Sequence, residues 1–359
     1  MPAPSPIIPN VLKPGDTIAF VSPSARLVDK CPAYIARATT LLTNKGYKVR
    51  QFYNSDTGIQ NSIANRVSEL RAAFTDPGIS AIICVIGGPS FTELVPALVA
   101  DAALHEAIRA HPKIVVGYSD ITGLHWFLHA VTGLRTFYGP GVLPELGEPA
   151  SVDDEGSALA FTVRNLFRAI ADREPIGDVD RSKVFVPKLP PIIAQPDEPN
   201  ELVPNAGWTW IRPGKGQGRL FGGCLSVMAR LAGIRALAPD WRGRVVFIET
   251  AIGEDHVSGN PIYRVQAFIA DLIAQGVFED AAGLVVGRPF GYNTPEMREE
   301  YINVIKGLLC DGPLAEKDFP ILFNVDFGHT APHVTLPFDT LVSLDSEKDQ
   351  FAILESAVV

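Results

Sequence analysis

The sequence predicts an α/β protein with two domains. The first would be a mostly parallel sheet flanked by helices, and the second a smaller, mixed β/α domain of barrel-like character. Three observations predict this: a length of 359 residues, an alternation of short apolar and amphipathic segments as far as Pro140, and a proline-rich interruption. We therefore expect an N-terminal domain over residues 1–172, a crossing over 173–214 and a C-terminal domain over 215–359.

Strand and helix patterns alternate in the N-terminal part. The predicted strands are residues 17–21, 47–52, 81–86 and 113–118, and the predicted helices are residues 32–45, 64–75, 91–99, 121–131 and 155–171. Such alternation indicates a sheet covered on both faces, whose ligands bind at the carboxyl ends of the strands. Three polar or glycine-rich segments follow strands there: residues 22–24, 87–90 and 117–120.

Seven prolines from Pro175 to Pro204 exclude any long regular element, so the segment from 173 to 214 is interpreted as the crossing between domains. Regular patterns resume after it. A glycine-rich stretch at 214–218 precedes predicted helices at 224–232 and 262–275 and predicted strands at 244–249, 283–286, 320–325, 334–336 and 340–344.

Composition excludes several classes of protein. With 31 basic and 40 acidic residues, the formal charge of −9 argues against a general nucleic-acid binder. No apolar run approaches the roughly 18 residues that span a bilayer, and the first residues lack the pattern of a secretory signal. The four cysteines, Cys31, Cys84, Cys224 and Cys310, form no C-x-x-C pair. We expect free thiols, a cytoplasmic location and no contact with a membrane.

Ser119 occupies an abrupt predicted turn from strand to helix, in the segment Gly117-Tyr118-Ser119-Asp120. A hydroxyl there would be exposed above the sheet, and the first amides of the helix would favour developing negative charge. The segment is not a G-x-S-x-G elbow, because Ile121 stands two positions after the serine. Ser119 is therefore a candidate nucleophile; the alternative is that Ser119 or Asp120 merely caps the helix.

Gly87 and Gly88 end another strand at the same predicted edge. Because glycine lets a backbone amide approach a ligand closely, this turn could supply a second donor to an oxyanion. The alternative is an ordinary turn between a strand and a helix.

A serine nucleophile needs a base, most often histidine, and a carboxylate to orient it. His125 and His129 lie four apart on one helix but lack an H-E-x-x-H motif, so packing or surface roles are expected. His329 and His333 share a later loop, and spacing does not choose between them. Glu249 ends an apolar strand, where it is either a functional carboxylate or a solvated strand end.

Six segments, taken in order, resemble the L,D-carboxypeptidase family of serine peptidases, which includes the microcin C immunity peptidases. They are residues 85–96, 116–122, 136–140, 218–225, 247–250 and 328–337. The resemblance implies a Rossmann-like or amidotransferase-like N-terminal domain, a site in the cleft between domains, a homodimer, and neither metal nor organic cofactor.

Residue by residue, the resemblance makes Ser119 the nucleophile, His329 the base and Glu249 its orienter. The backbone amides of Gly88 and Asp120 become the oxyanion donors, and His333 takes a structural role.

The resemblance leaves the substrate open. Residues 86–90 are closer to the immunity-peptidase branch, and Trp208 and Trp210 could stack on a nucleobase, the alternative being packing between domains. The first expectation is hydrolysis of an amide bond next to a terminal carboxylate, in a muropeptide or another small peptide conjugate. Hydrolysis of aminoacyl nucleotides such as aspartyl nucleotides is the alternative, and a non-catalytic small-molecule binding protein is an alternative of another class.

Overall fold

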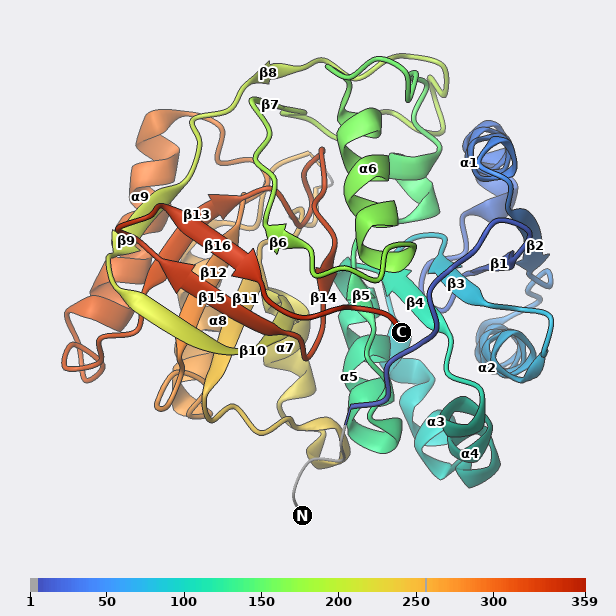
Figure 1. Cartoon of the computed structure of the whole chain (residues 1–359), viewed down its shortest axis with the longest axis horizontal. Coiled ribbons are helices and arrows are strands. Elements are labelled where there is room, and N and C mark those ends of the chain that lie inside the picture. The colour runs from blue at the N-terminus through green and yellow to red at the C-terminus, as the bar shows by residue number, and fades with distance from the viewer. Residues whose placement is uncertain (1–5, 256) are drawn as a thin grey trace.

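The computed structural model describes residues 6–255 and 257–359 and contains two main sheets with flanking helices (Figure 1). The first sheet has six strands in the order β14-β5-β4-β3-β1-β2. Its strands are β1 (Thr17–Val21), β2 (Lys48–Phe52), β3 (Ala81–Cys84), β4 (Ile114–Gly117), β5 (Phe137–Tyr138) and β14 (Leu336–Pro337). All pairs are parallel except β14 with β5. The prediction of a mostly parallel N-terminal sheet is confirmed.

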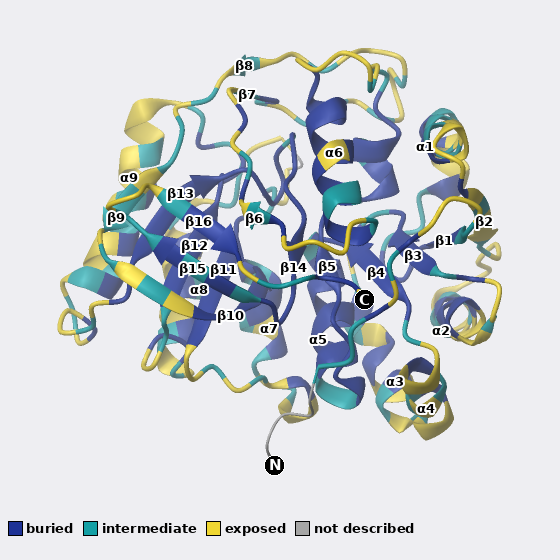
Figure 2. Ribbon diagram, viewed as in Figure 1, coloured by how far each residue is buried: buried dark blue, intermediate teal, exposed yellow. Residues whose placement is uncertain are grey.

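Six α-helices accompany this sheet in the described residues. They are α1 (Pro32–Asn44), α2 (Ile59–Thr75), α3 (Val95–Ala100), α4 (Ala102–Ala110), α5 (Thr122–Thr132) and α6 (Ala158–Ile170). Most of α5 is buried because it contacts α4 on one side and α7 and β10 of the second half on the other (Figure 2). Trp126 of α5 donates its indole N–H to the carbonyl of Gly222 at 2.9 Å, so this helix joins the two halves.

The second sheet has eight strands in the order β6-β16-β15-β10-β11-β12-β13-β9. The strands are β6 (Gly177–Asp178), β9 (Thr209–Arg212), β10 (Lys215–Cys224), β11 (Arg244–Glu249), β12 (Gly283–Gly287), β13 (Ile321–Val325), β15 (Leu341–Asp345) and β16 (Gln350–Ile353). Strands β10 to β13 are parallel, and the outer pairs are antiparallel. The helices of this half are α7 (Leu225–Leu231), α8 (Ile262–Ala274) and α9 (Pro295–Ile305). A separate, mixed C-terminal sheet is thus confirmed.

Several elements differ from the sequence prediction. The glycine-rich stretch 214–218 runs into β10, where glycines allow close approach to the neighbouring backbone. The sequence shows no clear helix pattern for α9 and no clear strand pattern for β16. The expected strand at 334–336 is β14, which joins the first sheet by pairing Leu336 with Tyr138. Residues from the C-terminal half therefore complete the N-terminal sheet, and the exact domain bounds stay a prediction.

The proline-rich crossing holds only short strands, β6, β7 (Val184–Phe185) and β8 (Val203–Pro204), before β9 begins. It passes over the end of α6 in Figure 1. Among the described helices, none combines the length and apolar character needed to cross a membrane.

Candidate active site

Ser119 follows the buried strand β4 after one intervening residue, Tyr118, and occupies the first position of a 3₁₀ turn that leads into α5. Its φ of 65° lies in the left-handed region, which a residue other than glycine rarely adopts. Strained backbone of this kind clusters at functional sites, where the surrounding structure holds it. The turn presents the Ser119 hydroxyl to His329, and its role as nucleophile stays a prediction.

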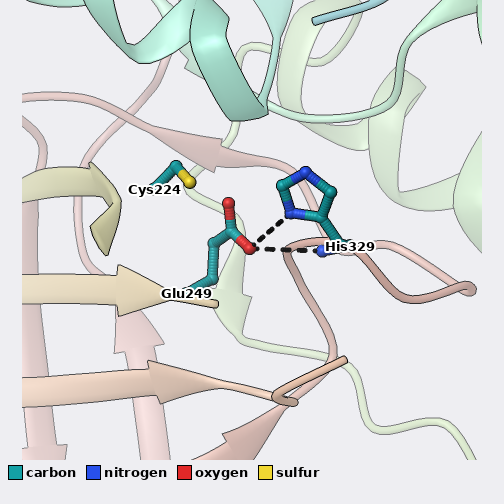
Figure 3. A group of neighbouring side chains, drawn as sticks. All are labelled: Cys224, Glu249 and His329. Atoms are coloured by element: carbon teal, nitrogen blue, oxygen red, sulfur yellow. Dashed lines mark hydrogen bonds and ion pairs between the residues drawn. The ribbon is translucent and has the colours of Figure 1, made fainter. Parts of the chain in front are cut away.

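A chain of hydrogen bonds joins Ser119, His329 and Glu249. The Ser119 Oγ lies 2.8 Å from Nε2 of His329, and Nδ1 of the same ring lies 2.8 Å from Oε2 of Glu249. Glu249 is the last residue of β11, and His329 lies in the loop after β13, so the site forms where strands of both sheets end. Figure 3 shows the Glu249 carboxylate directed at the His329 ring. This arrangement can pass a proton from the serine hydroxyl to the imidazole.

Glu249 is fully buried, yet it stays ionised. Burial alone would raise its pKa, but the charge and hydrogen bond of His329 and the hydroxyl of Tyr138 hold the pKa below its ordinary value. Tyr138 donates to Oε1 of Glu249 at 2.6 Å. An ionised Glu249 would stabilise an imidazolium at His329.

Gly328 lets the histidine loop approach Glu249. Its φ is +103°, and a Cβ at this position would lie 2.7 Å from the Cβ of Glu249 and 2.8 Å from Oε2. A residue larger than glycine does not fit at position 328, because its Cβ would clash with the Glu249 side chain whose carboxylate contacts His329. The backbone N–H of His329 also donates to Oε2 at 3.3 Å.

Tyr138 is a site residue that sequence reasoning did not single out. Besides donating to Glu249, its hydroxyl accepts the Ser119 backbone N–H at 3.1 Å. It therefore links the strained serine turn to the carboxylate. The only sequence signal was its place in the segment 136–140, because β5 has just two residues and shows no periodicity.

The backbone amides of Gly88 and Asp120 are the expected oxyanion donors. Within the described residues, neither the Gly88 nor the Asp120 N–H donates to a backbone acceptor. Gly87 packs directly against the serine turn: a Cβ there would lie 2.7 Å from Ser119 Cβ and 3.1 Å from the Asp120 nitrogen. The glycine turn thus reaches Ser119, and the role of Gly88 and Asp120 as oxyanion donors stays a prediction.

The Asp120 side chain fastens these two turns together. Its Oδ2 accepts the Phe91 N–H at 2.5 Å and the Ser24 hydroxyl at 2.7 Å, and its Oδ1 pairs with Arg230. Ser24 lies after β1, so all three polar segments that the sequence placed at the sheet edge meet here. The Asp120 side chain therefore connects these turns, besides its place at the start of the helix.

Replacing Gly87 with alanine is expected to lower kcat by about 100-fold, because the added methyl displaces the Ser119 hydroxyl by a fraction of an ångström to an ångström. Gly233→Ala is the matched control, since a Cβ at Gly233 meets no atom within 4 Å. Steady-state kinetics of both variants, with melting temperatures, make the comparison. An unimpaired Gly87→Ala enzyme would contradict the close approach of the two turns.

Cys224 lies beside Glu249 and His329, and the ligand atoms of these three residues all lie within 4.8 Å of one another (Figure 3). Burial raises the pKa of the Cys224 thiol well above its ordinary value, so the thiol is protonated. A metal there would have to displace the hydrogen bond between His329 and Glu249. The absence of a metal in this protein stays a prediction.

The other histidines near the site have packing roles in the described structure. His125 contacts Thr136 Oγ1 at 2.8 Å and the Gly117 carbonyl at 2.9 Å, and burial lowers its pKa to about 4. His333 is fully buried, and burial lowers its pKa to about 3. Its ring packs on Tyr118, 4.9 Å between centroids, and does not contact Ser119. Geometry therefore selects His329 from the two histidines of the loop.

Trp208 and Trp210 lie away from this arrangement. The Trp208 ring packs on Phe351, 6.4 Å between centroids, and below the Arg181 guanidinium at 3.7 Å. Trp210 lies on β9 and donates its indole N–H to Asp349 at 2.8 Å. Neither ring lines the cavity beside His329. A role in substrate binding stays a prediction, and the observed contacts are packing contacts.

Glu145 is a second buried carboxyl close to the site. It accepts the Tyr118 hydroxyl at 2.8 Å and the Gly141 N–H at 2.9 Å, yet burial raises its pKa from 4.5 to about 7. At a pH below the ordinary value of 4.5, Glu145 is neutral in both the folded and the unfolded protein, so its burial carries no penalty from charge. As the pH rises towards about 7, the unfolded chain ionises first, so folding loses stability.

Replacing Glu145 with glutamine should remove this pH dependence. Between about pH 5 and about pH 8, the free energy of unfolding of the wild type should fall by about 3 kcal/mol relative to that of Glu145→Gln. This value comes from about 1.4 kcal/mol per pKa unit, applied to the raised pKa of Glu145. Denaturant unfolding of both proteins across this range measures the difference. A difference that does not change with pH would mean that Glu145 ionises in the folded protein as it does in the unfolded chain.

The fold is a mixed α/β fold with two sheets, and a serine, a histidine and a glutamate meet where strands of both sheets end, an arrangement that can support hydrolysis. The profile of the LD-carboxypeptidase N-terminal domain matches residues 18–139, and that of the LD-carboxypeptidase C-terminal domain matches residues 217–344. The chain belongs to the LD-carboxypeptidase family of peptidases, and the resemblance predicted from its segments is confirmed.

Individual relatives cover nearly the whole chain. A Vibrio cholerae protein named as a carboxypeptidase is 30% identical over 348 residues, 96% of each chain. The microcin C7 self-immunity protein MccF of Escherichia coli is 27% identical over 98% of this chain and 96% of its own. A Bacillus subtilis protein named as a murein peptide carboxypeptidase is 26% identical over 98% of this chain and 95% of its own. The structure of apo MccF superposes with a TM-score of 0.83 at 26% identity, covering 99% of this chain and 100% of that one.

Proposed function

We propose that this protein is a serine-type carboxypeptidase that hydrolyses an amide bond through Ser119, His329 and Glu249. The observation that carries the proposal is the continuous chain of hydrogen bonds from the Ser119 hydroxyl through the imidazole to a buried, ionised carboxylate. Membership of the LD-carboxypeptidase family supports the same reaction class.

The proposed reaction has two halves. In the first, the Ser119 Oγ attacks the amide carbonyl carbon while Nε2 of His329 takes the hydroxyl proton, and the amides of Gly88 and Asp120 donate to the oxyanion. The C–N bond then breaks as His329 returns the proton to the leaving amine. In the second half, water attacks the acyl-enzyme with His329 again as base, which releases the acid and restores Ser119.

Labelling with a fluorophosphonate tests the serine mechanism against the non-catalytic alternative. An activated serine forms a stable phosphonyl adduct, whereas a serine that only contacts a ligand does not react. We expect stoichiometric labelling of the wild type at Ser119, located by peptide mass spectrometry. Absence of the adduct would favour a small-molecule binding protein.

The first candidate substrate is a muropeptide or another small peptide conjugate, cut at the amide bond next to its terminal carboxylate. The relative named as a murein peptide carboxypeptidase supports it. The second candidate is an aminoacyl nucleotide, because MccF matches nearly the whole chain and has been solved in complex with aspartyl sulfamoyl adenosine. Turnover of an L,D-tetrapeptide and of an aspartyl nucleotide, measured side by side, separates the two.

The family resemblance also supports a homodimer in the cytoplasm that needs no metal or organic cofactor. Light scattering of the purified protein tests the dimer, and a monomer at micromolar concentration would contradict it.

Trp208→Ala provides a separate test of the nucleobase-stacking hypothesis. Since the ring packs on Phe351 and Arg181, we expect a loss of about 1 to 3 kcal/mol in stability, below the range of a fully buried tryptophan. Turnover of peptide and nucleotide substrates should fall equally or not at all. A selective loss of about 10-fold or more on the nucleotide would instead support stacking.

A further inference from the structure

A cavity beside His329 has no role in the steps above. One wall comes from the catalytic region, another from the turn over 142–148, and the third from the proline-rich crossing. The lining residues are Tyr118, Pro144, Glu145, Glu148, Val186, Lys188, Leu189, Pro190, Asn200, Phe290, His329, Thr330 and Ala331. Because His329 itself lines the cavity, a group bound there would lie beside the proposed catalytic base.

Two carboxyl side chains face this cavity and are almost completely buried. Glu145 is 5% exposed and Glu148 is 6% exposed. Glu145 accepts one hydroxyl and one backbone N–H, both neutral donors. Within the described part of the chain, no lysine, arginine or histidine forms an ion pair with either carboxylate. Two acids are therefore buried together without a partner cation, an arrangement that favours either their protonated forms or a ligand that supplies positive charge.

The charged and titratable groups around the cavity leave a negative charge unbalanced. They are Glu145, Glu148, Lys188, His329 and the Tyr118 phenol, with Asn200 and Thr330 as neutral polar groups. Because burial raises the pKa of Glu145 to about 7, a bound cation would favour its ionised form, and Lys188 could then balance only one of the two carboxylates. Burial also raises the pKa of Glu148, against the hydrogen bond that Asn200 offers, as expected for an acid that lacks a cation.

We propose that this cavity binds a primary ammonium group of the substrate between Glu145 and Glu148. The proposal rests on the proposed hydrolytic function, because it places the ammonium in the molecule that His329 and Ser119 cleave. An ammonium has three donors and no acceptor, which complements carboxylate oxygens, and it is more compact than a guanidinium. The ammonium could be an amine of a peptide or the α-amine of an aminoacyl nucleotide.

Binding to the Ser119→Ala protein tests the site without turnover. The peptide arm uses a peptide ending in lysyl-D-alanine whose lysine amine is free, dimethylated or acetylated. The nucleotide arm uses aspartyl sulfamoyl adenosine and its N-acetyl derivative. In at least one of the two arms, calorimetry should show that the free amine binds about 10- to 100-fold more tightly than the acetylated form, because only the free amine forms charged hydrogen bonds. The dimethylated amine keeps its charge, so its affinity should fall less than that of the acetylated form.

Variants of the protein locate the effect. In the Ser119→Ala background, Glu148→Gln should weaken binding of the free amine by about 10-fold and leave the acetylated form unchanged. Glu198→Gln, which removes an exposed charge from the same crossing, is the control and should change neither. If the Glu148→Gln protein does not fold, the comparison of free and acetylated ligands on the Ser119→Ala protein alone tests the ammonium site.

Equal binding of free and acetylated forms in both arms, or no binding in either, would overturn the ammonium site. A Glu148→Gln protein that binds the free amine as tightly as its Glu198→Gln control would also overturn it. The hydrolytic proposal fails separately, if the wild type cleaves none of these compound classes and takes no fluorophosphonate label even where selective binding is found.

Discussion

Replacing Ser119 with alanine should reduce hydrolysis by about 10³-fold or more, the loss typical of a catalytic nucleophile. The change removes one hydroxyl at a turn and no apolar core volume. Alanine tolerates a φ of 65° no worse than serine does, so the backbone should keep its conformation. Single-turnover kinetics on a cleaved substrate measures the loss.

The unchanged fold is the control for this prediction. Ser119→Ala should melt within a few degrees of the wild type and should take no fluorophosphonate label. Near wild-type turnover by a homogeneous preparation would show that another group is the nucleophile. An inactive but unfolded variant would leave the Gly87→Ala kinetics as the independent measure of the serine turn.

Much of the architecture could be predicted because it depends on local patterns. The apolar runs that became β1, β3, β4 and β11 are short and bounded by polar or glycine residues, and the helices between them have amphipathic spacing. Strand pairing followed from the alternation, since parallel strands need long crossovers. By contrast, β5 has only two residues and is fixed by its pairing with β4 and β14, so no periodicity marks it. A strand was expected at β14, but its place in the first sheet depends on tertiary contacts that the sequence pattern does not show.

The candidate site was predicted unevenly for a related reason. Ser119 stands at a recognisable local turn, but His329 lies 210 positions later in the chain, and spacing does not encode such a contact. Only the family resemblance favoured His329 over His333, and the observed hydrogen bonds agree with that choice. Tyr138 was not assigned a role, because its value lies in two hydrogen bonds that appear only when β5 is placed beside β4.

The tryptophans show the limit of composition-based reasoning. Aromatic residues after a proline-rich segment are compatible with a flap over the cleft or with packing between domains. In the structure Trp210 lies on an edge strand with its indole N–H paired to Asp349, and stacking on a substrate stays a prediction.

Substituting Glu249 and His329 together should reduce activity little more than substituting His329 alone. The Glu249 carboxylate acts through His329: it accepts Nδ1–H at 2.8 Å and favours the imidazolium. Each single change, Glu249→Gln and His329→Ala, should lower kcat by about 10³-fold or more. Once the imidazole is gone, Glu249 has no proton transfer left to assist, so the losses cannot multiply.

A double-mutant cycle on kcat measures this dependence, with Glu249→Gln plus Trp208→Ala as its control. Trp208 lies in a separate cluster with Phe351 and Arg181, so the control losses should combine independently. Melting temperatures identify any variant that loses activity by unfolding, since Glu249 also holds the Tyr138 hydroxyl. If the Glu249 and His329 losses multiplied as the control pair does, Glu249 would act on the fold of the site and His329 would perform proton transfer without it.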